Sequence, residues 1–144
     1  MSDIRSRSFY ARWQQIPTRW ADNDLYGHIN NAAYYGFFDT LVNGFLIEKA
    51  GLDIHESAVI GLVVETGCQY FSPLAYPDMI EAGLRIAHIG NSSVRYEIGL
   101  YQKEALLASA QGHFVHVYVD RETRRPVSLP QAMRDALEKL HAQD

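Results

Sequence analysis

Two carboxylates lie in a short polar turn that precedes the longest apolar-periodic segment of the sequence. Asp22 and Asp24 are followed by Gly27, which allows a bend, and by Asn30 and Asn31, either of which suits the cap of a helix. The first turn of a helix presents unbonded backbone N–H groups and a partial positive charge, so it favours anions and developing oxyanions. The pattern predicts a general base or nucleophile and an oxyanion donor on one short segment.

A largely buried helix from Asn31 to about Ala50 is predicted to position this turn. Its apolar residues recur at spacings of three and four, and Tyr35 and Ile47 widen the apolar stripe. Lys49, with the glycine that follows Ala50, is a typical stop signal. The recurring residues are Tyr34, Phe37, Phe38, Leu41, Val42, Phe45 and Leu46.

The hydrophobic pattern of the rest of the chain predicts mainly strands. They are expected at residues 59–71, 79–89, 93–101 and 106–119, after an extended segment at 11–20 and before a short helix at 131–141. Because helices do not alternate with strands, we predict an α+β fold in which an antiparallel sheet wraps around one long central helix. A chain of 144 residues fits a single domain, 1–144.

The run RWADNDLYGHINNAAYYGFFD, at residues 19–39, resembles the signature of hotdog-fold acyl-CoA thioesterases of the 4-hydroxybenzoyl-CoA thioesterase type. The later segments IGNSSVRYE and GHFVHVYVDRETRRPVSLP are also similar to that family, so the resemblance covers most of the chain. It implies the hotdog fold and hydrolysis of an acyl-CoA or acyl-ACP thioester. The matching residues of the first run are Asp24, Gly27, His28, Asn30, Asn31 and Tyr34.

The resemblance also implies roles for these residues. Asp24 would act as the general base, or as a nucleophile that forms a mixed anhydride, and the sequence does not separate the two routes. The backbone N–H near Asn31 would be the oxyanion donor. His28 would bond the thioester or orient a water molecule, whereas an ordinary turn role remains its alternative. Gly27 and Tyr34 would line the substrate site.

Three further acids have alternative interpretations. Glu65 falls where plant acyl-ACP thioesterases have a strand carboxylate, but alternation places it away from the apolar face unless Gly67 marks a bulge. Asp22 either assists Asp24 through like-charge repulsion or bonds the turn amides, and we favour the second role. Asp39 stands where many relatives have a helix glutamate, which leaves its role open.

The phosphates of coenzyme A need donors, and two turns offer them. One turn supplies amide and hydroxyl groups and the other supplies guanidinium groups, for which a solvated surface turn is the simpler interpretation. The residues of the first turn are Asn91, Ser92 and Ser93, and those of the second are Arg121, Arg124 and Arg125.

The amino-acid composition excludes several other classes of protein and of site. The single cysteine, Cys68, rules out an intrachain disulfide, and its place on an apolar strand face favours a small buried hydrophobe over a nucleophile. His113 and His116 are three residues apart, which on a strand sends them to opposite faces, so no metal site is predicted. A net charge of −4 argues against nucleic-acid binding, and no stretch reaches the roughly 18 apolar residues of a membrane span.

We therefore expect a cytoplasmic enzyme that needs no cofactor. The resemblance implies a homodimer or homotetramer with active sites between subunits, since an open sheet leaves edges to cover. Two alternatives remain open. A hotdog enoyl-thioester hydratase or dehydratase would add or remove water without releasing thiol, and a non-catalytic acyl-thioester-binding protein would leave its ligand intact.

Overall fold

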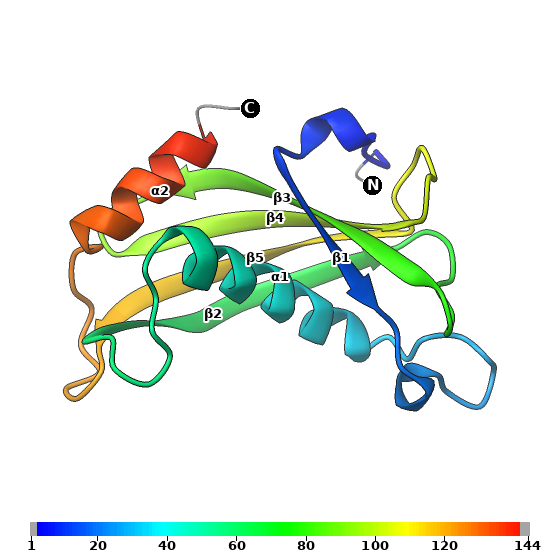
Figure 1. Cartoon of the computed structure of the whole chain (residues 1–144), viewed down its shortest axis with the longest axis horizontal. Coiled ribbons are helices and arrows are strands. Elements are labelled where there is room, and N and C mark those ends of the chain that lie inside the picture. Colours follow the sequence, from blue (N-terminus) through cyan, green and yellow to red (C-terminus); the bar gives the residue numbers. More distant parts are fainter. Residues whose placement is uncertain (1–2, 142–144) are drawn as a thin grey trace.

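The computed structural model describes residues 3–141 of the chain. Its elements are η1 (Arg7–Phe9), β1 (Arg12–Pro17), η2 (Trp20–Asp22), α1 (Ala33–Lys49), β2 (Val59–Tyr70), β3 (Met79–Ile89), β4 (Ser93–Gln102), β5 (Ala110–Asp120) and α2 (Gln131–His141). The strands of this part form an antiparallel sheet in the order β1-β3-β4-β5-β2. Figure 1 shows the long helix α1 lying across one face of this sheet. The predicted α+β architecture is confirmed.

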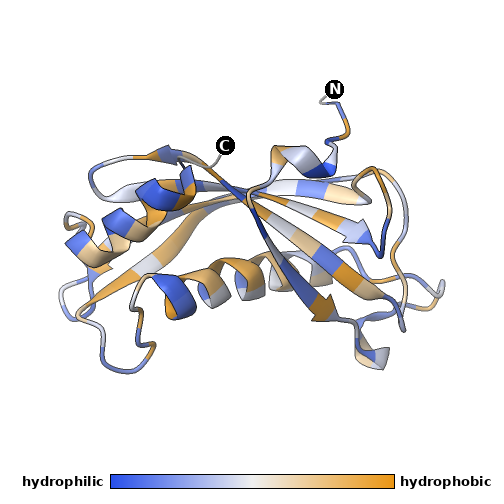
Figure 2. Ribbon diagram, turned by 45° about the horizontal axis from the view of Figure 1, so that its top comes forward, coloured by the Kyte–Doolittle hydropathy of each residue, from blue (hydrophilic) through white to orange (hydrophobic). Residues whose placement is uncertain are grey.

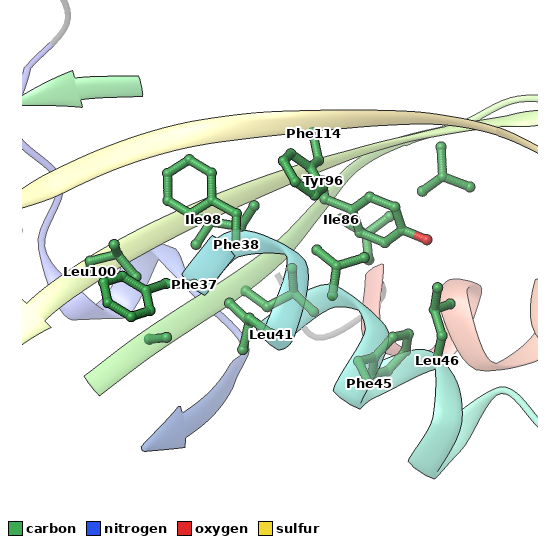
Figure 3. Close-up of a cluster of buried hydrophobic side chains, with 14 of the residues drawn as sticks. Phe37, Phe38, Leu41, Phe45, Leu46, Ile86, Tyr96, Ile98, Leu100 and Phe114 are labelled. Atoms are coloured by element: carbon green, nitrogen blue, oxygen red, sulfur yellow. The ribbon is translucent and has the colours of Figure 1, made fainter. Parts of the chain in front are cut away.

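The core is the contact between α1 and the middle of the sheet. All the recurring apolar residues of the predicted stripe, from Tyr34 to Leu46, are buried. Figure 3 shows this face of the helix against side chains of the central strands, among them Ile86, Tyr96 and Ile98. Fully burying one large apolar side chain contributes about 1.5–3 kcal/mol, so this stripe fixes α1 firmly on the sheet. The start of α1 therefore has a rigid support.

The predicted helix differs from the structure at its start and at Ile47. The helix begins at Ala33, two residues later than expected, and Ala32 at its N-cap makes no side-chain capping bond. Instead, Asn30 Oδ1 accepts a hydrogen bond of 2.9 Å from the Ala32 N–H, so the side chain shapes the turn before the helix. Ile47 does not widen the buried stripe, since it is 50% exposed.

Two strand boundaries are also corrected. The first strand ends at Pro17 rather than at Trp20, which belongs to the short η2 turn and is 76% exposed. The last strand begins at Ala110 rather than at residue 106. The N–H of Ser109 still donates to the Leu100 carbonyl of β4, but the N–H of Ala108 donates to the Arg5 carbonyl, outside the strands.

A bulge in β2 changes which residues face α1. The register against β5 shifts between Val63 and Glu65, and after the shift Thr66 lies opposite Phe114, whose ring packs on the helix residue Phe38. Directly opposed residues of an antiparallel pair share a face, so the half of β2 that ends at Tyr70 turns its even-numbered residues toward α1. The bulge therefore lies before Glu65, not at Gly67 where the sequence allowed one.

Hydropathy separates the two helices. In Figure 2, α1 is orange or pale along most of its length, whereas α2 carries strongly hydrophilic stretches beside its buried residues. α2 buries one side, formed by Met133, Leu137 and Leu140. Within residues 3–141, neither helix combines the length and the apolar character that crossing a bilayer requires.

Candidate functional site

Asp24 organises the polar turn before α1. Its backbone N–H donates to the His28 carbonyl at 2.8 Å, and its Oδ1 accepts bonds from the N–H groups of Tyr26 at 2.8 Å and His28 at 3.5 Å. Gly27 has a φ of +80°, a conformation that glycine adopts at low cost. In the described part of the chain, the second oxygen, Oδ2, accepts no hydrogen bond. We call residues 22–31 the site turn; it leaves half of this carboxylate available.

Asp22 is used differently from Asp24. It is buried, and its carboxylate accepts bonds from the backbone N–H of Arg19 at 2.8 Å and from the Arg19 guanidinium at 2.8 and 3.2 Å. The hydrogen bond to the Arg19 side chain lowers the pKa of Asp22. Its carbonyl also accepts the N–H of Asn30. This geometry agrees with the structural role that the sequence favoured for Asp22.

A pocket of about 280 Å³ opens beside the site turn. Three predicted site residues, His28, Asn31 and Tyr34, line it together with Tyr70. Asp24 is not part of its wall, but burial raises the pKa of Tyr34 and the negative charge of Asp24 adds to that rise. Asp24 is hydrogen-bonded to the backbone of His28, which lines the pocket, so it lies next to the pocket. The other lining residues are Ile29, Phe71, Ser72 and Pro73.

Asn31 brings an open donor to this pocket. Its backbone N–H donates no hydrogen bond to any residue between 3 and 141, whereas its carbonyl accepts a bond of 2.9 Å from the hydroxyl of Tyr70. The Tyr70 ring also meets the Tyr34 ring edge-on, with centroids 4.9 Å apart. Tyr70 was missed as a site residue because it comes from β2, far along the sequence, and lies beyond the bulge.

The structure does not bring Glu65 to this pocket within one chain. Because Glu65 is opposite Val115, next to the inward-facing Phe114, it lies on the face of the sheet away from α1. Its Oε2 is 2.8 Å from His113 Nε2 and 3.5 Å from Arg95 Nη1. The bulge precedes Glu65 rather than following it at Gly67, so it does not turn this side chain inward.

The two turns expected to hold coenzyme A phosphates lie at the opposite end of the sheet. Residues 91–93 join β3 to β4, and the length of β3, Met79–Ile89, separates them from the site turn by roughly 30 Å. The carbonyls of Asn91 and Ser92 accept backbone N–H bonds from Leu129 and Tyr118. Arg121 donates to the carbonyls of residues 54 and 57, so part of the basic turn braces a loop.

The two histidines of β5 have the environments that their positions predict, whereas Cys68 is half-buried rather than fully buried. Burial raises the pKa of the Cys68 thiol to about 11, which keeps it from forming a nucleophilic thiolate near neutral pH. His116 is buried and His113 lies on the opposite face. Within residues 3–141 no group of three or more histidine, cysteine, aspartate or glutamate side chains has the geometry to hold a metal ion.

Comparison with known proteins places these features in a family context. Residues 18–137 match the model of the thioesterase-like superfamily. The crystal structure of the PA5185 protein from Pseudomonas aeruginosa is 54% identical in sequence, with 96% of each chain covered and a TM-score of 0.94. The sequence has no match among curated proteins.

More distant structures share the fold. The 1,4-dihydroxy-2-naphthoyl-CoA thioesterase Slr0204 from Synechocystis is 17% identical, with 89% of this chain and 96% of that chain covered and a TM-score of 0.80. The SAV2348 protein from Staphylococcus aureus, solved in complex with CoA, is 18% identical, with 92% and 84% covered and a TM-score of 0.83. At these identities the similarity establishes a shared fold.

Proposed function

Because the chain belongs to the thioesterase-like superfamily, we propose that it hydrolyses the thioester of an acyl-CoA, or of an acyl group on an acyl carrier protein, to a free acid and a thiol. One observation carries this proposal. The unbonded N–H of Asn31 and the open Oδ2 of Asp24 belong to one rigid turn beside a pocket. Thioester hydrolysis needs both an oxyanion donor and a base or nucleophile.

The chemistry follows from this pairing. The thioester carbonyl oxygen accepts the N–H of Asn31, which stabilises the negative charge that develops when the carbonyl carbon is attacked. Asp24 either takes a proton from the attacking water or attacks the carbon itself to form an anhydride that water then opens. The carbon–sulfur bond breaks and the thiolate leaves. His28, which lines the pocket, would bond the thioester or a water molecule.

A homodimer through β2 is part of this proposal. β2 is an edge strand of the sheet, and it exposes the apolar side chains of Leu62, Val63 and Val64. An open edge of this kind is a template for pairing with a second strand, and a two-fold axis would pair β2 with itself in antiparallel orientation. A tetramer of two such dimers remains compatible with the fold.

Antiparallel pairing would bring the basic turn of one copy beside the pocket of the other. β2 ends at Tyr70, which lines the pocket, and begins at Val59, beside the turn at residues 121–125, where the N–H of Arg121 donates to the Ala58 carbonyl. The start of one paired strand lies next to the end of its partner. Arg124 and Arg125 are exposed in that turn and suit the phosphates of coenzyme A. The turn at residues 91–93 is a second proposed contact.

The test is release of free thiol from a panel of acyl-CoAs. Asp24→Asn and Asp24→Ala should lower the rate on the order of 10²- to 10⁴-fold, the range for a positioned proton-transfer group. Asp135→Asn is the matched control, since this exposed carboxylate on α2 bonds only the neighbouring Gln131 side chain among the described residues and should leave the rate unchanged. Unchanged turnover in both Asp24 variants would contradict the assignment, and Glu65→Gln would then identify the alternative acid.

The same assay separates the other functions of this scaffold. A hydratase would convert an enoyl-CoA to its hydroxyacyl-CoA, which is measured by the loss of enoyl absorbance without thiol release. A binding protein would retain acyl-CoA intact with Asp24 present or absent. Either result would replace the hydrolase proposal.

A further inference from the structure

A second pocket, of about 350 Å³, lies at the other end of α1. It is enclosed by three elements that are far apart in the sequence: the start of β1, the last turns of α1 and one side of α2. In Figure 1 the end of α1 lies close to α2. Phe45 and Lys49 contribute from α1, while Tyr34, which lines the first pocket, is about 16 Å away from Phe45 along the helix axis. The two pockets are therefore separate.

Each of the three elements supplies one cation to this second pocket. The cations are Arg12 from β1, Lys49 from α1 and Lys139 from α2. Glu48 neutralises part of this charge, since its carboxylate is 2.7 Å from Arg12 and 3.8 Å from Lys49. The hydrogen bond from Arg12 lowers the pKa of Glu48, so this acid is ionised at neutral pH. The rim still carries a net positive charge.

The floor of the pocket is apolar. It is formed by Ala11, Phe45, Ala136 and Leu140, and the guanidinium of Arg12 lies over the Phe45 ring with its carbon 5.3 Å from the ring centroid. An apolar floor inside a cationic rim complements a molecule with an apolar body and one anionic end. A volume of about 350 Å³ lies at the small end of the range of ligand pockets, which suits a short amphiphile better than a nucleotide.

Helix electrostatics alone does not explain this arrangement. Lys49 and Lys139 each lie in the last turn of a helix, where a cation complements the helix dipole. Arg12 belongs to a strand, so the dipole does not account for it. Moreover, its Nε is buried and has no hydrogen-bond partner within residues 3–141, which leaves the guanidinium incompletely satisfied. Only its Nη2 is used, by Glu48.

We propose that this second pocket binds an amphipathic carboxylate, with the apolar body against Phe45 and Leu140 and the carboxylate between Arg12, Lys49 and Lys139. Guanidinium and ammonium groups form charge-assisted hydrogen bonds with a carboxylate. The exposed Glu48 side chain can release Arg12 to the ligand, because it extends from the helix surface into solvent. This binding does not depend on the reaction at the site turn.

The experiment uses octanoate as the probe and amide NMR of the full chain as the readout. Octanoate should shift the amide signals of residues 45–50 and 136–140 saturably. Octanol, which has the same apolar body without the charge, should not shift them saturably. Lys139→Glu should weaken octanoate binding about tenfold or more, because it turns an attractive charge pair into a repulsive one. Lys139 is exposed, so this variant tests the charge rather than the fold.

Lys103→Glu is the matched control, since it makes the same charge change in an exposed turn outside the pocket. It should leave octanoate affinity unchanged, and both variants should keep their thiol-release activity. The proposal is overturned if octanoate shifts only the signals of residues 24–34 and 70–73, at the first pocket. It is equally overturned if Lys139→Glu binds octanoate as tightly as wild type, if octanol binds as well as octanoate, or if no signal responds.

Discussion

Two groups of polar side chains in this molecule differ in how far their hydrogen-bonding capacity is used. In the first group, which comes from β4 and β5, the hydroxyl of Tyr118 is 2.6 Å from that of Tyr96 and 3.2 Å from His116 Nδ1. None of these three residues is more than 2% exposed. We call these residues the buried trio. In the site turn, by contrast, Asp24 keeps an open oxygen and Asn31 an open N–H beside a pocket.

This difference predicts that the buried trio contributes to the stability of the fold and that the site turn contributes to catalysis. Burial raises the pKa of Tyr96 and of Tyr118 and lowers that of His116 to about 4, so the trio is neutral at neutral pH and its members bond one another. A satisfied network of this kind rigidifies a core. The open groups of the site turn contribute no such bonds to the fold and remain available to a ligand. Variants in the trio should change stability, and variants in the turn should change rate.

The largest stability effect is expected for Tyr118→Phe. The substitution keeps the ring but leaves the Tyr96 hydroxyl and His116 Nδ1 buried without their partner. Each unsatisfied buried group costs about 1–3 kcal/mol, so for two groups the free energy of unfolding should fall by about 2–6 kcal/mol in urea titrations. Thiol release by the folded variant should match wild type. Tyr76→Phe, which removes an exposed hydroxyl that bonds no group within residues 3–141, is the control. A change below about 0.5 kcal/mol would show that the trio is not a satisfied network.

A pH-dependent effect of about 2 kcal/mol is expected from His116. The folded state holds its pKa near 4, whereas the unfolded value is 6.5, so between these values the unfolded chain binds more protons. Stability should therefore fall as the pH is lowered from 6.5 to 5, by about 1.4 kcal/mol per unit at most. The carboxylate of Asp22, whose pKa the fold lowers, titrates below this window, since its reference value is 3.8.

His116→Gln removes the titrating group and keeps a side chain that can bond the Tyr118 hydroxyl. Urea titrations of both proteins at pH 6.5 and pH 5 should show the loss in wild type and little of it in the variant. Equal losses in the two proteins would assign the pH dependence to other groups. The loss of stability at low pH would then not result from protonation of His116.

Local patterns predicted the parts of the fold that depend on neighbouring residues. The apolar stripe of α1, the range of β3 and the helix at 131–141 follow from periodicity within each segment, and the structure has all three. The site turn was found in the same way, since its polar residues and glycine are consecutive. The bulge in β2 was not predictable at its position, because residues 59–71 give apolar alternation on both sides of it.

Features made by distant segments escaped sequence reasoning. The bond from the Tyr70 hydroxyl to the Asn31 carbonyl joins residues 39 positions apart. The second pocket joins β1, α1 and α2, and no local pattern marks its three cations as neighbours. His116 was considered only as a poor zinc ligand, since a sequence does not show that its Nδ1 bonds the Tyr118 hydroxyl, which in turn bonds the Tyr96 hydroxyl. Periodicity identifies what a segment buries, but pairing across the sheet decides which polar groups are left open.

The smallest expected effect, and the sharpest test of the comparison, comes from Tyr70→Phe. The substitution removes the bond to the Asn31 carbonyl but keeps the ring contact with Tyr34. A hydrogen bond of this kind contributes about 0.5–1.5 kcal/mol, which corresponds to a roughly threefold to tenfold loss of kcat if it holds the oxyanion donor in place. KM should stay nearly constant, because the hydroxyl bonds the backbone rather than the substrate. A rise in KM at constant kcat would instead mean that Tyr70 binds substrate directly. If the variant lost stability at unchanged kcat, the Tyr70 hydroxyl would stabilise the fold, as the buried trio does, without contributing to catalysis. An exposed position beside the pocket would then no longer indicate a catalytic role.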